Sequence, residues 1–223
     1  MMKTLTLFVM FALTILCSLT LSAQKVLKEG MLKYSISIES SNGEKQISVA
    51  LNGATLSVYL TKDKSRSEMI STPGTETTVY DNKSGRGFIL KEYSGQKLMI
   101  TTTAENWKQK NQVNSGLNFE VQPGTTSIAG HVCKKALAKS NNGKSYTVYF
   151  DPSILIENKQ YNNAFSQLAG LPVQYELSSG NLIFRYTLTG FNIEILNATK
   201  FDSPKSGFRV MSYEENQQLK KVE

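Results

Sequence analysis

The 223-residue sequence is poor in the residues that most often carry chemistry, with two cysteines, one histidine and one tryptophan. Cys17 lies in an apolar N-terminal segment that we expect to be removed, so only Cys133 remains and no intramolecular disulfide can form. One histidine and one cysteine fall short of the three or four ligands that a zinc site needs. The acidic residues do not cluster either, so we expect no metal site, no cofactor and no disulfide scaffold.

The sequence also lacks a dense run of basic residues. It holds 25 Lys and Arg against 18 Asp and Glu, a formal net charge of +7. These basic residues are spread along the chain and form no recognition helix, which argues against a nucleic-acid-binding protein. A basic surplus of this size favours contact with anionic surfaces, so an anionic membrane surface is a possible partner.

The N-terminus has the three-part pattern of a secretion signal. Lys3 is followed by an apolar run over 5–21 and then by the small residues Ser22 and Ala23. A retained membrane anchor is the alternative, but a run of about 17 residues is near the lower length limit for a transmembrane helix. We therefore predict a signal peptide at 1–23 and an exported chain, periplasmic or secreted, that is soluble after cleavage.

The rest, 24–223, shows the alternation of short strands and tight turns that is typical of antiparallel β proteins. Leu32, Tyr34 and Ile36 alternate with polar residues, for example. We predict one mainly β domain, a strongly curved antiparallel sheet or half-open barrel with a few short helices covering its concave side. The predicted strands lie at 32–38, 46–51, 55–61, 76–80, 87–93, 97–102, 132–139, 145–150, 173–178, 182–188 and 191–197.

Three segments interrupt this rhythm. The pair Thr102 and Glu105 has capping-box spacing and predicts a short helix over 103–112. The segment 152–170 is rich in asparagine, so a continuous helix is not expected there. The pair Ser212 and Glu215 predicts a polar C-terminal helix.

Three blocks of the sequence, 127–136 (SIAGHVCKKA), 168–173 (LAGLPV) and 201–207 (FDSPKSG), resemble the motifs of an exported Gram-negative family catalogued as domain of unknown function 4412. That resemblance covers most of the mature chain and implies an architecture similar to the lipoprotein carriers of the LolA and LolB type. Such carriers are half-open barrels, plugged by helices, that shelter acyl chains. A shared fold would not by itself establish a shared function.

His131 and Cys133 are two residues apart and would lie on the same face of a strand, which is the spacing of a possible nucleophilic dyad. The sequence marks no third group that would orient the histidine. A small buried thiol beside a surface histidine is the plainer interpretation. We therefore predict no catalytic residues and no enzymatic activity.

Aromatic and aliphatic side chains share single faces of several predicted strands. Core packing is their ordinary meaning, and an apolar cavity between the curved sheet and the helices is the functional alternative. The candidate cavity residues are Trp107, Tyr146, Val148, Phe150, Phe165, Tyr175, Phe184 and Tyr186.

These expectations lead to two hypotheses. The first is a non-enzymatic periplasmic binding or carrier domain for an apolar ligand, such as a lipid or the acyl chain of a lipoprotein. The second is an interaction or structural module of the cell envelope with a packed core and no small ligand.

The signal-peptide hypothesis predicts that the exported protein begins at or within a few residues of Gln24. N-terminal sequencing of protein extracted from the cell envelope measures this directly. Recovery of chains that still begin at Met1 would contradict cleavage.

Overall fold

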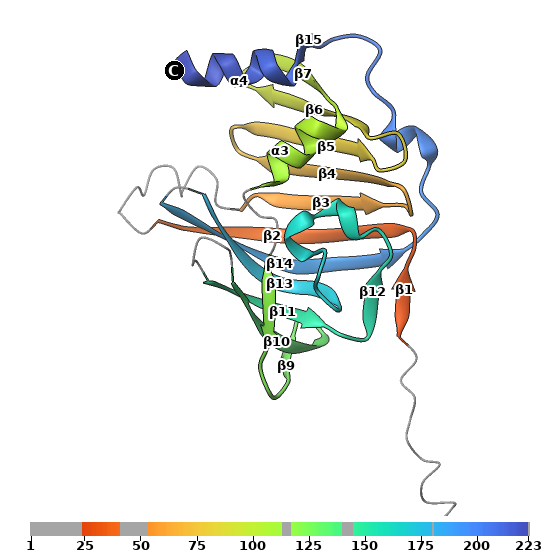
Figure 1. Cartoon of the computed structure of the whole chain (residues 1–223), viewed down its shortest axis with the longest axis vertical. Coiled ribbons are helices and arrows are strands. Elements are labelled where there is room, and N and C mark those ends of the chain that lie inside the picture. Colours follow the sequence, from red (N-terminus) through yellow and green to blue (C-terminus); the bar gives the residue numbers. More distant parts are fainter. Residues whose placement is uncertain (1–23, 41–52, 113–116, 140–144, 180, 223) are drawn as a thin grey trace, which may run out of the picture.

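The computed structural model describes residues 24–40, 53–112, 117–139, 145–179 and 181–222. The predicted signal peptide at 1–23 and the predicted strand at 46–51 lie outside these residues. As predicted, the fold is mainly β and is built on one large curved sheet (Figure 1). The strands of this sheet are β2 (Gly30–Ser40), β3 (Thr55–Leu60), β4 (Lys64–Ser71), β5 (Gly74–Asp81), β6 (Arg86–Tyr93), β7 (Gln96–Thr102), β8 (Asn118–Val121), β9 (Thr126–Ile128), β10 (His131–Lys139), β11 (Ser145–Asp151), β13 (Leu171–Ser179), β14 (Leu182–Ile193) and β15 (Arg209–Ser212).

The sheet follows the order β15-β7-β6-β5-β4-β3-β2-β14-β13-β11-β10-β8, with β9 paired to β10. All neighbours are antiparallel except β15, which runs parallel to β7. The long β2–β14 pair joins an N-terminal meander to a C-terminal one. In the part of the chain that the structure describes, the end strands β15 and β8 do not pair, so the sheet stays open. Beside it, β1 (Lys25–Leu27) pairs in parallel with β12 (Ile154–Ile156).

The strand predictions need correction where two segments merge and where strands were missed. Besides β4, the missed strands are β1, β8, β9, β12 and β15. The segments 182–188 and 191–197 form one strand, β14, whose register shifts between Leu188 and Gly190 and which ends at Ile193. Strand β4 was not predicted, because its sequence KSRSEMIS lacks the apolar alternation that marks a half-buried strand. It forms because β3 and β5 pair with it on both sides.

The two faces of the sheet are covered by different parts of the chain. Residues 194–208 pass over one face, where Phe201 of η5 (Ala198–Phe201) packs on Val79 and Phe88. The helix α3 (Ala104–Asn111) and the short helices η3 (Lys159–Tyr161) and η4 (Asn163–Phe165) lie over the other, concave face (Figure 1). The largest apolar core lies under η4, where Phe165 and Leu168 meet Phe150, Val173 and Tyr175.

The first turn of α3 is held in two ways. Its capping box uses Thr103 and Asn106, not the predicted Thr102 and Glu105, with Asn106 N donating to Thr103 Oγ1 at 3.3 Å. Asn106 Nδ2 also donates to Glu214 Oε1 at 2.7 Å. Glu214 belongs to α4 (Tyr213–Val222), so this bond links the two helices. The predicted capping box of Ser212 and Glu215 is confirmed.

None of the helices in the described ranges is both long and apolar enough to span a membrane.

A buried asparagine fastens the start of the concave cover to the sheet. Asn158 is 3% exposed, and its Nδ2 donates to the carbonyls of Thr61 and Lys64 at 3.0 and 3.1 Å. Its Oδ1 accepts from Asn82 Nδ2 at 2.8 Å. One side chain therefore joins the segment before η3 to the β3–β4 and β5–β6 turns.

Replacing this side chain should destabilise the protein because it removes the partner of the Thr61 carbonyl and of the Asn82 amide, whereas the Lys64 carbonyl keeps the hydrogen bond from Thr61 N. We expect Asn158→Ala to lower the free energy of unfolding by about 2–3 kcal/mol. Chemical denaturation measures the effect, with Asn163→Ala as the control because Asn163 is half-buried in the same segment. A control variant as unstable as Asn158→Ala would contradict the fastening role.

Candidate functional site

A hollow of about 230 Å³ lies between the concave face of the sheet, α3 and η3. The sheet supplies its floor, while α3 and the segment around η3 supply its roof. The residues that line it are Tyr34, Leu56, Val58, Ser67, Thr78, Trp107, Lys110, Asn111, Tyr161, Asn162, Tyr175 and Tyr186.

The floor is open because small side chains lie in register there. Val58, Ser67 and Thr78 are direct neighbours on β3, β4 and β5 and point to the same face. Trp107 reaches this region from α3 and stacks flat on Tyr80, with ring centroids 4.1 Å apart and an interplanar angle of 5°. The indole therefore roofs a part of the floor that small side chains leave unfilled.

Tyrosine rings form one wall of the hollow. Tyr175 stacks on Tyr186 at 4.7 Å, and the ring of Tyr34 meets Tyr175 edge-on at 5.6 Å. Tyr34 Oη donates to the carbonyl of Pro172 at 2.9 Å. These contacts fix the rings, so the wall is preformed rather than mobile.

Burial keeps these phenols protonated. It raises the pKa of Tyr34, Tyr161 and Tyr175, and it raises the pKa of Tyr186 to about 12. A phenol that stays neutral at physiological pH is a hydrogen-bond donor and not a general base. The wall is therefore suited to contact with a ligand and not to proton abstraction.

Two polar atoms of the roof are buried without a hydrogen-bond partner in the described part of the chain. They are Trp107 Nε1 and Tyr161 Oη. Buried polar groups in proteins are nearly always hydrogen-bonded, so such atoms need an explanation.

The structure brings only some of the predicted cavity residues to this hollow. Trp107, Tyr175 and Tyr186 line it. By contrast, Val148, Phe150 and Phe165 are buried in the main apolar core, and Tyr146 packs partly buried against that core. Phe184 packs against a smaller cluster with Ile36 and Ile38.

Sequence reasoning missed nine of the twelve lining residues, among them Ser67, Thr78 and Tyr161. Strand β4 had no alternation to reveal it, and Tyr161 lies in a segment without regular periodicity. The signal that could have revealed the floor is the alignment of small residues on neighbouring strands. That alignment can be recognised only when the strand register is known.

Two other hollows lie in the described part of the chain. One, of about 700 Å³, is lined by the polar side chains of Glu105, Lys108, Gln109, Gln112 and Asn163.

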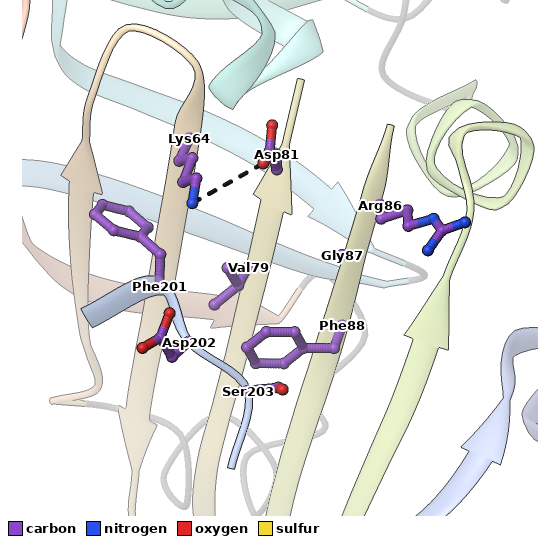
Figure 2. Close-up of a pocket in the computed structure, with 9 residues that line it drawn as sticks. All are labelled: Lys64, Val79, Asp81, Arg86, Gly87, Phe88, Phe201, Asp202 and Ser203. Carbon is purple, nitrogen blue, oxygen red and sulfur yellow. Dashed lines mark ion pairs between the residues drawn. The ribbon is translucent and has the colours of Figure 1, made fainter. Parts of the chain in front are cut away.

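The other, of about 250 Å³, lies on the opposite face of the sheet beside Phe201 (Figure 2). Two of its charged groups pair with each other, and the other two point apart. Lys64 Nζ lies 4.0 Å from Asp81 Oδ2, and the Arg86 side chain extends away from Asp202.

The histidine that the sequence singled out has a carboxylate partner. His131 Nδ1 lies 2.8 Å from Asp151 Oδ2, and Ser153 Oγ donates to Asp151 Oδ1 at 2.6 Å. Cys133 is fully buried, and its Sγ donates to the backbone carbonyl of His131. Burial, and then the charge of Asp151, raise the pKa of the thiol to about 11. The thiol is therefore protonated at neutral pH and is not a ready nucleophile.

Within the described ranges, no cluster of three or more His, Cys, Asp or Glu residues could hold a metal ion.

The Asp151 carboxylate should make the free energy of unfolding depend on pH in the acid range. Burial alone would raise its pKa, but the hydrogen bonds from Ser153 and His131 outweigh burial and lower it. A lowered pKa in the folded state contributes stability above the ordinary pKa of about 4, and this contribution is lost as the pH falls through the lowered value.

We expect Asp151→Asn to lower the free energy of unfolding at pH 7 by about 1–3 kcal/mol, with the deficit shrinking below about pH 4. Denaturant titrations across the pH range measure this, and Asp202→Asn at an exposed position is the matched control. A deficit that does not change with pH would contradict the ionic role.

No protein-family model and no curated protein match this chain. Among solved structures, an uncharacterised conserved protein from Thermus thermophilus aligns with a TM-score of 0.50 and 10% identity, over 90% of this chain and 98% of that one. PNGF-II aligns with a TM-score of 0.44 and 12% identity over 85% of this chain, which spans about a third (32%) of PNGF-II. MucB aligns with a TM-score of 0.40 and 11% identity, over 80% of this chain and 58% of MucB. At these identities the likeness to the Thermus protein establishes a shared fold and nothing more.

Proposed function

We propose that this chain is a non-enzymatic binding protein of the cell envelope that holds an apolar ligand, such as an acyl chain, in the hollow under α3. The observation that carries the proposal is the lining. Seven of its twelve residues are aromatic or aliphatic, and the rings of Tyr175 and Tyr186 are stacked on each other. A small ligand site is typically a preformed, mostly apolar concavity with a few polar groups.

The size of the hollow limits what it takes. Ligand pockets usually measure about 300–1,000 Å³, and this one is slightly smaller. It therefore suits one end of an elongated ligand rather than a whole lipid. Each methylene that moves from water into such a site contributes about 0.8 kcal/mol, so even a short alkyl segment gives useful affinity.

Export by the N-terminal signal would place the protein where lipids and lipoproteins are handled. Its basic surplus would favour approach to anionic headgroups. Membership of the domain of unknown function 4412 family, which the sequence blocks suggest, belongs to the same proposal.

The second candidate, an interaction module without a small ligand, is favoured by one observation. The half of the concave side under η4 is filled by a dense core around Phe150, Phe165 and Leu168. If the hollow beside it holds only solvent, the fold is a scaffold for protein contacts.

Filling the floor of the hollow should separate these candidates. We expect Ser67→Leu to weaken binding of a fluorescent fatty acid at least about tenfold, because the new side chain occupies the space between Val58 and Thr78. Ser57→Leu, on β3, is the matched control. Ser57 lies between the lining residues Leu56 and Val58 of that strand, so its side chain faces the other side of the sheet. It should change affinity by less than about twofold.

The measurement is fluorescence titration of delipidated protein, followed by competition with unlabelled fatty acid and by thermal unfolding of each variant. Absence of saturable binding to the folded wild-type protein would favour the module without a ligand. Equal loss of affinity in both variants would show that binding occurs elsewhere.

A further inference from the structure

The concave face of the sheet stays apolar beyond the hollow. Apolar side chains continue there on β2, β3, β4 and β14, which lie side by side in the sheet (Figure 1). We call this cluster the apolar strip, and it consists of Ile36, Ile38, Ala54, Leu56, Met69, Leu182, Phe184 and Tyr186. None of these residues comes from a described helix. The strip therefore belongs to the sheet itself and not to the segments that cover it.

The strand register places the strip on the same face as the floor of the hollow. Leu56 and Met69 are direct neighbours on β3 and β4. Each lies two residues from a floor residue of its own strand, Val58 on β3 and Ser67 on β4. Side chains two residues apart in a strand point to the same face. The strip is thus a continuation of the floor along the strands.

Two side chains belong both to the hollow and to the strip. Leu56 and Tyr186 line the hollow and also pack in the strip. From Tyr186, the strip continues on β14 to Phe184, which lies directly opposite Ile38 of β2. A chain that leaves the hollow past Leu56 and Tyr186 therefore meets apolar side chains on the same face of the sheet.

The strip is partly open, and it ends at a charged pair. Met69, Leu182 and Phe184 are half-buried, so each still has apolar surface to remove from water. On β5 the direct neighbour of Met69 is Glu76, whose Oε2 lies 3.8 Å from Lys91 Nζ on β6. An apolar ligand therefore gains contact from β4 towards β14 and not towards β5.

We propose that the strip binds the part of an alkyl ligand that the hollow does not hold, and that the ligand is therefore a long-chain acyl group or lipid. This inference rests on the proposed function and goes beyond it by naming a second contact surface and the class of chain length. The hollow measures about 230 Å³, whereas ligand pockets usually measure about 300–1,000 Å³, so a long chain must extend out of it. The strip is the apolar surface that continues from its lining.

Octanoate and palmitate test the strip because they share a carboxylate and differ in chain length. Displacement of a fluorescent fatty acid measures both affinities, at concentrations where each probe is monomeric. We expect Met69→Gln to weaken palmitate at least about fivefold and octanoate by less than about twofold. The amide must lose water to contact the part of the chain that only palmitate has.

Ile70→Gln is the matched control for Met69→Gln. Ile70 is the next residue on β4, so its side chain points to the other face of the sheet, where it is 48% exposed. It should leave both affinities within about twofold of wild type. Leu182→Gln and its control Ile183→Gln form a second pair on β14, for use if Met69→Gln does not fold.

The outcomes separate this inference from the proposed function. Ser67→Leu should weaken both probes, because both enter the hollow that it fills. Palmitate binding that Met69→Gln leaves unchanged, or weakens no more than octanoate binding, would overturn the role of the strip while binding in the hollow stands. No binding of either probe to folded wild-type protein would remove the proposed function and the inference with it.

A second copy of the chain is the other occupant that the test can reveal. Sedimentation of the ligand-free protein measures its self-association. A dimer that Met69→Gln dissociates, together with unchanged palmitate binding, would show that a second copy covers the strip and would overturn the inference.

Discussion

A curved sheet presents alternate side chains of every strand to its concave side, so whatever apolar surface gathers there must be covered by other parts of the chain. Here the cover comes in two pieces, one between β7 and β8 and the other between β12 and β13. The second piece carries Phe165 and Leu168 and fills the space beneath it. The first piece is a single short helix with one large ring, Trp107, directed at the sheet. The hollow lies where these unequal covers meet above the small side chains of Ser67 and Thr78.

The position of the Trp107 ring depends on a glycine at the start of β6. A Cβ at Gly87 would lie 2.2 Å from the carbonyl oxygen of Val79 and 3.0 Å from the ring of Tyr80. Its absence lets Tyr80 lie close to the sheet, and this ring is the surface on which Trp107 stacks. The asparagine in the first turn of α3 then links the helix to Glu214 of α4. The roof is therefore set by backbone packing in β6 and by a polar contact to the C-terminal helix, and not by helix propensity.

The sequence predicted most strands because half-buried strands show their period of two, as β2 does with Leu32, Tyr34 and Ile36. It could not predict β4, whose largely polar sequence lacks that period, nor could it join the halves of β14 across an irregular register. The same limit applies to the site. Alternation correctly placed Tyr175 and Tyr186 on the concave face, but it could not show that these two rings also line a hollow, whereas Val148 and Phe150 of the same core do not. That distinction depends on strand register and on which cover lies above each residue. The carboxylate partner of His131 is likewise 20 residues away along the chain and was marked by no motif.

Buried polar atoms without a partner carry a cost in any fold. A buried donor without an acceptor costs about 1–3 kcal/mol, which is a large share of the net stability of a domain. Phenylalanine at position 161 would avoid this cost and keep the ring contact, so a fold that needed only a filled core has a simpler solution available. Asn158 and Tyr34 do satisfy their buried polar atoms, whereas Asn82 Oδ1, on the residue that donates to Asn158, has no partner in the described part of the chain. Four such atoms, Asn82 Oδ1, Thr102 Oγ1, Trp107 Nε1 and Tyr161 Oη, are found in the described ranges, and only two of them belong to residues that line the hollow, so an unpartnered buried atom does not by itself mark a ligand site.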